Sequence, residues 1–134
     1  MSVIYSNPDG LAPPLGAYSH VASGRGPIVA VAGQVATVGD RLVGEGDCAA
    51  QVVQTFANVK HALASEGLEP RDLLQLTTYL VDANHIPIFY EARARVFEEM
   101  FPDGAYPPNT LLVIDRLVQP EILVEMSALA IAPE

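Results

Sequence analysis

The sequence has few cations and little charge of either sign. Seven of its 134 residues are Lys or Arg, against sixteen Asp or Glu, so the formal net charge is −9 at pH 7. Binding to a phosphate backbone requires clustered cations, and the chain has no basic run. A nucleic-acid partner is therefore not expected. Only 17% of the residues are charged, against about a quarter in typical soluble domains. Part of the surface is therefore expected to be covered by another subunit.

Cysteines and long apolar runs are also scarce. A single cysteine, Cys48, excludes an intrachain disulfide and gives no metal-ligand cluster. The histidines, His20, His61 and His85, are too scattered for metal-ligand spacing. No apolar run approaches the roughly 18 residues that a membrane span needs. The first ten residues do not resemble a signal peptide, so we expect a cytoplasmic protein with neither metal nor membrane.

What the chain does contain predicts one α+β domain over residues 1–134. Asp47 is a plausible N-cap for a helix that ends near residue 66, where Gly67 suits a C-terminal cap. A second helix is expected from residue 84 or 85, with Pro87 in its first turn. Strands are expected at the N-terminus, at 18–22 and 28–33 as a hairpin, at 41–43 and at 73–81. The order is ββ(β)αβαββ, a mixed sheet with both helices on one face.

The stretch 106–133 draws most attention. It predicts two strands, 109–116 and 122–131, joined by a short turn at Gln119-Pro120-Glu121. Residues 110–114 are apolar on both faces, which is typical of a strand buried on both sides. Glu125 interrupts the second run, and a carboxylate there needs a partner, a water-lined pocket or a raised pKa. Glu125 is therefore the first candidate for chemistry.

The strands carry apolar residues on both faces, yet two helices can cover only one of them. The economical way to bury the other face is symmetric association through the sheet, which predicts an oligomer.

Five short motifs, in order along the chain, resemble those of the Rid proteins, also called the YjgF family or reactive-intermediate deaminases. They are Gly16-Ala17-Tyr18-Ser19, Val31-Ala32-Gly33-Gln34, Gln54-Thr55 with Asn58, Pro107-Pro108-Asn109-Thr110, and Leu123-Val124-Glu125-Met126. The resemblance implies a chorismate-mutase-like fold and a homotrimer with a central β-barrel. It also implies three ligand clefts, each lying between neighbouring subunits.

The resemblance further implies a cofactor-independent hydrolase that converts enamines and imines of amino acids to keto acids and ammonia. In such deaminases an arginine of the fourth motif forks onto the substrate carboxylate, and the glutamate of the fifth motif positions water. Here Asn109 stands in place of that arginine. A desolvated charge-assisted pair contributes about 1.5–3 kcal/mol, so carboxylate capture there would weaken by roughly ten- to hundred-fold. An efficient 2-aminoacrylate deaminase is therefore not expected.

The predicted site has one catalytic residue, Glu125, and ligand-binding residues Tyr18, Gly33, Gln34, Asn109 and Thr110. For Glu125 the alternative is a structural carboxylate paired with Arg116 or Arg25. Arg93 and Arg95 could lend a charge in place of the absent arginine, although arginines on a helix are more often solvated.

Three functions follow from these residues. The first is hydrolysis of an imine, enamine or related C=N compound, with Glu125 activating water. The second is a trimer that binds a metabolite without turning it over. The third, disfavoured by the acidic charge, is the ribonuclease or translation-inhibitor role sometimes attached to the family.

Overall fold

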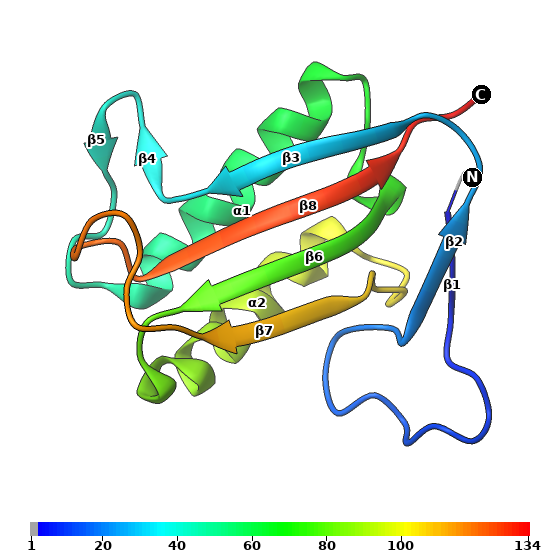
Figure 1. The fold of residues 1–134 in the computed structure, drawn as a ribbon, viewed down its shortest axis with the longest axis horizontal. Coiled ribbons are helices and arrows are strands. Elements are labelled where there is room, and N and C mark those ends of the chain that lie inside the picture. The colour runs from blue at the N-terminus through cyan, green and yellow to red at the C-terminus, as the bar shows by residue number, and fades with distance from the viewer. Residues whose placement is uncertain (1–2) are drawn as a thin grey trace.

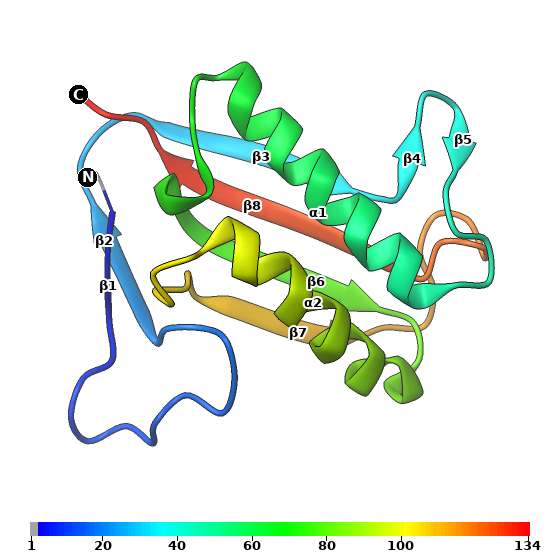
Figure 2. The same cartoon turned by 180° about the vertical axis from the view of Figure 1, so that it is seen from behind.

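A four-stranded mixed sheet with two helices against one face forms the body of the protein (Figures 1 and 2). The computed structural model describes residues 3–134. The predicted α+β class is confirmed. The strands are β1 (Val3–Ser6), β2 (Val21–Gly24), β3 (Ile28–Gln34), β4 (Thr37–Val38), β5 (Arg41–Leu42), β6 (Leu73–Leu80), β7 (Asn109–Val113) and β8 (Val124–Ile131). The α-helices are α1 (Cys48–Ser65) and α2 (Ile86–Met100), and the short 3₁₀ helices are η1 (Pro70–Asp72) and η2 (Ala83–His85).

Both helices begin and end where local chemistry predicts. The Asp47 side chain caps α1 by accepting a hydrogen bond from the Ala50 N–H at 3.1 Å. Gly67 follows the helix with φ of +73°, a conformation that favours glycine. Pro87 lies in the first turn of α2, where no helical N–H is needed. Over residues 3–134, neither helix is long and apolar enough to cross a membrane.

The core lies between the helices and the sheet. Helix α1 contributes a fully buried stripe at helical spacing, and the ring of Phe56 in that stripe packs against Phe89 and Phe97 of α2 at centroid distances of 6.3 and 5.4 Å. Burying each such side chain stabilises the fold by about 1.5–3 kcal/mol. The stripe of α1 consists of Val52, Phe56, Val59 and Leu63. This layer holds the two helices on one face of the sheet.

The strand order β3-β8-β6-β7 corrects the predicted pairing of the last two strands. β7 pairs in parallel with β6, and β8 lies antiparallel between β3 and β6. The expected hairpin of 109–116 with 122–131 is therefore wrong. A β–helix–β crossover brings β7 to β6, and the central position is taken by β8, whose alternate residues are fully buried. As an edge strand, β7 leaves Leu112 39% exposed in the single chain, so burial on both faces is not observed there.

The predicted hairpin of 18–22 with 28–33 is also wrong. β2 pairs with β1 in a small separate sheet, whereas β3 continues into the main sheet beside β8. Gly26 (φ +136°) and Pro27 turn the chain between the two sheets, and the Ala132 N–H donates to the Pro27 carbonyl at 2.9 Å. A side chain at Gly26 would collide with the Ala132 backbone, so the bend depends on glycine.

Candidate functional site

Glu125 lies on the face of the sheet that the helices leave open. Its neighbours Val124 and Met126 point into the core and are fully buried, so the alternation of β8 turns Glu125 outward, where it is half-buried. Across the sheet it is in register with Tyr79 of β6. The ion pairs found within residues 3–134 do not include Glu125.

Neither predicted structural partner of Glu125 pairs with it within the described chain. The Arg116 guanidinium donates to the carbonyls of Leu117 and Val118 at 2.9 and 3.0 Å, and Arg25 lines a cavity at the other end of the sheet. The Glu125 carboxylate therefore remains available to water or a ligand.

Gly33 makes room for that carboxyl group. A Cβ built on Gly33 would stand 2.7 Å from Cδ of Glu125, far inside van der Waals contact. The pairing of β3 with β8 shifts register between Val31 and Gln34, which leaves the Gly33 backbone outside the regular ladder beside the carboxylate. The Gln34 side chain instead turns back and donates to the Ala32 carbonyl at 3.1 Å. The chain thus places Gly33 against Glu125, and Gln34 next to the pair.

Asn109 lies on the opposite side of the sheet. Its Oδ1 accepts a hydrogen bond from Thr78 Oγ1 at 3.0 Å, and Thr78 is buried beneath the helices. Asn109 is also in register with Leu76, another core residue. β6 separates β7 from β8, so the two strands lie about 10 Å apart. One chain therefore cannot present Asn109 and Glu125 to the same small ligand.

Tyr18 belongs with Asn109 rather than with Glu125. The Ser19 N–H donates to the Pro107 carbonyl at 3.4 Å, which ties the 11–19 loop to the segment just before β7. The Tyr18 hydroxyl oxygen accepts from the Leu15 N–H at 3.3 Å, and its ring meets the edge of His20 at 5.7 Å. Thr110 is exposed on β7 in register with Thr77. The predicted site residues thus form two groups, one with Tyr18 and Asn109 and the other with Gly33, Gln34 and Glu125.

Arg93 was not expected inside the protein. It is only 4% exposed, and its guanidinium carbon lies 5.2, 4.9 and 5.6 Å from the ring centroids of Phe89, Tyr90 and Phe97. Burial lowers the pKa of Arg93, and nearby tyrosines oppose that shift. The prediction of a solvated arginine holds for Arg95, which is exposed and paired with Glu91, and is wrong for Arg93. Its spacing four residues after Phe89 and four before Phe97 is the sequence signal for this burial.

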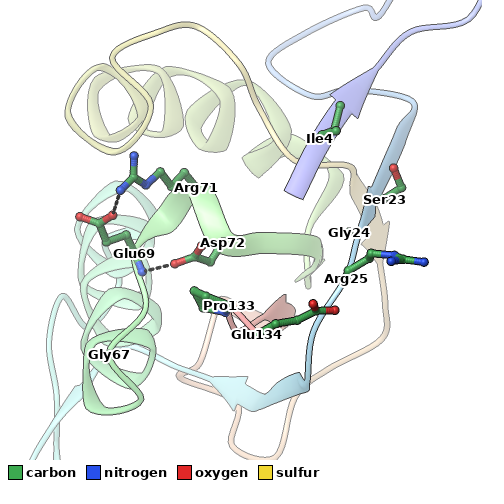
Figure 3. A pocket seen from close by; sticks show the side chains of 10 residues that line it. All are labelled: Ile4, Ser23, Gly24, Arg25, Gly67, Glu69, Arg71, Asp72, Pro133 and Glu134. Carbon is green, nitrogen blue, oxygen red and sulfur yellow. Dashed lines mark hydrogen bonds and ion pairs between the residues drawn. The ribbon is translucent and has the colours of Figure 1, made fainter. Parts of the chain in front are cut away.

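A cavity of about 800 Å³ lies away from both groups (Figure 3). It is bounded by β1, β2, residues 67–72 and the last two residues of the chain, and Arg71 pairs with Glu69 at its side at 2.7 Å. A hollow of about 190 Å³ lies on the open face of the sheet and includes Ser127, two residues from Glu125. Among the residues described, no three His, Cys, Asp or Glu side chains are grouped to hold a metal ion. The candidate site therefore rests on Glu125 and Gly33.

The sheet with two helices on one face, and the glycine of β3 set against the glutamate of β8, define the class: an α+β protein of the Rid type. The chain belongs to the family described as Endoribonuclease L-PSP, the YjgF/RutC family, which it matches over residues 10–132.

Relatives of known structure share the whole fold. A Rid family protein of Yersinia pestis, YyfB, superposes with a TM-score of 0.85 at 30% identity, covering 98% of this chain and 100% of that one. A RutC family protein of Pyrococcus horikoshii is 30% identical over 120 residues, which is 87% of this chain and 88% of the relative. Escherichia coli TdcF, solved with bound serine, shares the fold with a TM-score of 0.72 at 22% identity, covering 95% of this chain and 94% of that one.

Proposed function

We propose that this protein binds a small C=N compound in a cleft between two copies of the chain and hydrolyses it with Glu125. The observation that carries the proposal is the half-buried Glu125 carboxylate, which has no cation partner within the described chain and lies directly over Gly33. A carboxylate in that position can accept a hydrogen bond from a water molecule and direct it toward a ligand.

The chemistry needs one base and one water. Glu125 accepts a proton from the water as the water oxygen bonds to the imine carbon, the C=N electron pair moves to nitrogen, and Glu125 passes that proton to the nitrogen. As the C=O bond of the resulting carbinolamine forms, Glu125 takes the hydroxyl proton and passes it to the departing amine. An enamine enters the same route after protonation at carbon. The Gly33 and Gln34 backbone, next to the bulge, orients the ligand.

Two copies are needed because the predicted ligand-binding residues lie on different sides of one sheet. The open face that carries Glu125 also exposes apolar side chains, with Ile28 68% and Leu112 39% exposed in the single chain. Covering this face with other subunits would bury it and bring the Tyr18 and Asn109 group of one copy to the Glu125 group of its neighbour. The family resemblance favours three copies arranged around a barrel.

Asn109 shapes the expected substrate range. Its amide is already engaged by Thr78 and has no charge, so it cannot form the bidentate ion pair that an arginine would give a carboxylate. We therefore expect little or no acceleration when 2-aminoacrylate is generated by an amino-acid dehydratase and ammonia release is timed. A rate that matches an arginine-bearing family member would contradict this interpretation of Asn109.

The test of the hydrolase itself compares two glutamate variants. Ammonia or amine release from a panel of imines is measured for the wild type, for Glu125→Gln and for the control Glu121→Gln, which changes an exposed glutamate in the preceding loop. Loss of a catalytic base costs about 10²–10⁴-fold, so Glu125→Gln should lose that factor while the control retains full activity. Full activity in Glu125→Gln would make Glu125 structural.

A trimer that binds a metabolite without hydrolysis is the second candidate, because Asn109 removes the family's charged anchor but leaves Gly33 and Glu125 in place. Binding without turnover in the same panel would favour it. A ribonuclease role, despite the family's description, is disfavoured by the net charge of −9.

A further inference from the structure

We propose that Arg93 is the anion anchor of this protein, holding a small carboxylate between helix α2 and the 11–19 loop. The inference rests on the proposed function, since it names the charged group of the ligand that Glu125 would act on. It assigns to α2 a role that Asn109 on β7 cannot fill.

The first support is that Arg93 is a buried charge. It is only 4% exposed, on the inward face of α2, with its guanidinium against the rings of Phe89, Tyr90 and Phe97. Aromatic faces attract a cation, but they offer no acceptor for its N–H groups. A buried arginine normally has an anion or several carbonyl partners, because an isolated buried charge is costly.

The second support is that no such partner occurs within residues 3–134. The ion pairs of the described chain are Lys60 with Glu99, Arg71 with Glu69, and Arg95 with Glu91. The described side-chain hydrogen bonds include none from the Arg93 guanidinium, whereas Arg95 and Arg116 both donate. Arg93 therefore has donors to offer a ligand.

The third support is access. The buried side-chain atoms sealed from solvent without a partner are Thr55 Oγ1 and His85 Nδ1 in the described chain, so the unpaired Arg93 nitrogens retain contact with solvent. A Cβ built on Gly16 would stand 3.2 Å from Arg93 Nη2, which places the guanidinium directly under the loop that carries Tyr18. A larger residue at position 16 would close this approach.

The location connects Arg93 to the group of residues that includes Asn109. Helix α2 lies over β6 and β7 (Figure 2), and the loop above Arg93 is tied by Ser19 to Pro107, two residues before Asn109. The titratable side chains around Arg93 are those of Tyr18, Tyr90 and Tyr106, from the loop, the helix itself and the segment before β7. Within the described chain, no carboxylate forms an ion pair with it from these elements.

The ligand class follows from the charge. A single guanidinium among tyrosines and phenylalanines, in a chain of net charge −9, suits one negative charge better than two. A planar carboxylate matches the guanidinium fork. Because the anchor lies on α2 instead of β7, a carboxylate held there is placed differently relative to Glu125 than one held by an arginine at position 109, and pyruvate serves as a probe of the carboxylate alone. With Arg93 as the anion anchor, the chain can keep Glu125 as its catalytic residue without an arginine at position 109.

The test measures binding, independently of turnover. Pyruvate and its neutral analogue pyruvamide are titrated calorimetrically into the wild type, Arg93→Met and Arg95→Met. The last is a matched control that removes the same charge two residues away on the same helix. Loss of a desolvated charge-assisted pair should weaken pyruvate binding by roughly ten- to hundred-fold in Arg93→Met only, with pyruvamide binding equal in all three. Should Arg93→Met fail to fold, Gly16→Val keeps the charge and blocks the approach, with the same loss expected.

Several results would overturn the proposal. These are equal pyruvate binding in the wild type and both Arg93→Met and Gly16→Val, no preference for pyruvate over pyruvamide, or tighter Arg93-dependent binding of inorganic phosphate. A change of oligomeric state in Arg93→Met with pyruvate binding intact would mean that Arg93 pairs with a second copy. Arg93-dependent pyruvate binding without any imine hydrolysis would contradict the proposed hydrolase but support the anion site at Arg93. Hydrolysis of anionic imines with an unchanged KM in Arg93→Met would support the hydrolase but contradict the anion site.

Discussion

The two faces of the sheet differ in whether their polar side chains have hydrogen-bond partners. On the covered face, the fully buried Gln51 side chain donates to the carbonyls of Gly44 and Glu121 and accepts from the Leu123 N–H, all at 2.9–3.0 Å. On the open face, Glu125 has no such partner in the described chain. Satisfied buried polar groups hold a fold together, whereas an unsatisfied one is a candidate for ligand contact. By that criterion Arg93, a buried charge without an anion in the described chain, merits a binding test on the covered side.

The largest expected effect is on the open face. Leu129→Glu introduces a charge into the apolar surface that other copies should cover, next to Ala30 and Gln75. Light scattering should report three chains for the wild type and one for Leu129→Glu, with helical circular dichroism unchanged. Val118→Glu, at a position 79% exposed in a loop, should remain trimeric. A monomeric wild type would contradict the association argument.

On the covered face the expected effect is on stability. Gln51→Leu leaves the Leu123 N–H and two carbonyls without their partner, which should lower the free energy of unfolding by about 3 kcal/mol. Gln54→Leu is the control, since among residues 3–134 the Gln54 side chain bonds to Asn58 alone, one turn away on the same helix, and it should lose under about 1 kcal/mol. Urea denaturation of the two variants beside the wild type measures both losses. A loss in Gln51→Leu no larger than the control's expected value, about 1 kcal/mol, would show that the Gln51 contacts are not stabilising.

Gly33 tests whether the position of the Glu125 carboxylate matters for activity more than for stability. Gly33→Ala adds a methyl group where the Glu125 carboxyl lies, so the carboxylate must swing aside. Because that group is the flexible end of a side chain, stability should change by less than about 1 kcal/mol, whereas a misplaced catalytic group costs on the order of 10²-fold. Steady-state kinetics and thermal unfolding, compared with the exposed-site control Glu121→Gln, separate the two. Unchanged kinetics in Gly33→Ala would show that Gly33 does not contribute to the site.

The smallest effect is expected at Tyr5, whose hydroxyl donates to the Leu73 carbonyl at 2.7 Å and ties β1 to β6. Tyr5→Phe should lower stability by about 1 kcal/mol at neutral pH. Burial, together with Asp72, raises the pKa of Tyr5, so the folded protein keeps this proton longer than the unfolded chain does. The wild type should therefore lose stability as the pH rises above about 10, and Tyr5→Phe should lose less over that range. Identical pH curves would contradict this.

Local features of the fold could be predicted, and non-local ones could not. Asp47, Gly67 and the apolar stripe of α1 act within a few residues, so their sequence signals sufficed. Strand pairing depends on competition among distant segments: β8 had two partners, β3 and β6, and short turn signals at 23–26 and 119–121 suggested hairpins that do not form. Arg93 differs from the solvated arginine that its charge predicts, because Phe89 and Phe97, four residues before and after it, pack against its guanidinium.

The candidate site residues were chosen by motif resemblance, which does not show how they lie in space. The motifs assign Gly33 and Glu125 to one ligand site, and in the structure the two residues lie within contact distance of one another. They did not show that Asn109 faces the covered side, because the face of a strand residue depends on register. That placement is what makes a second copy necessary for the proposed cleft.

A crystal structure of the protein soaked with pyruvate tests that cleft most directly. We expect three chains around a barrel, with each pyruvate lying between Glu125 of one subunit and the Asn109 and Arg93 region of the next, its carboxylate against the Arg93 guanidinium. A pyruvate bound within one subunit, in the cavity beside Arg71 or away from Glu125 altogether, would contradict it.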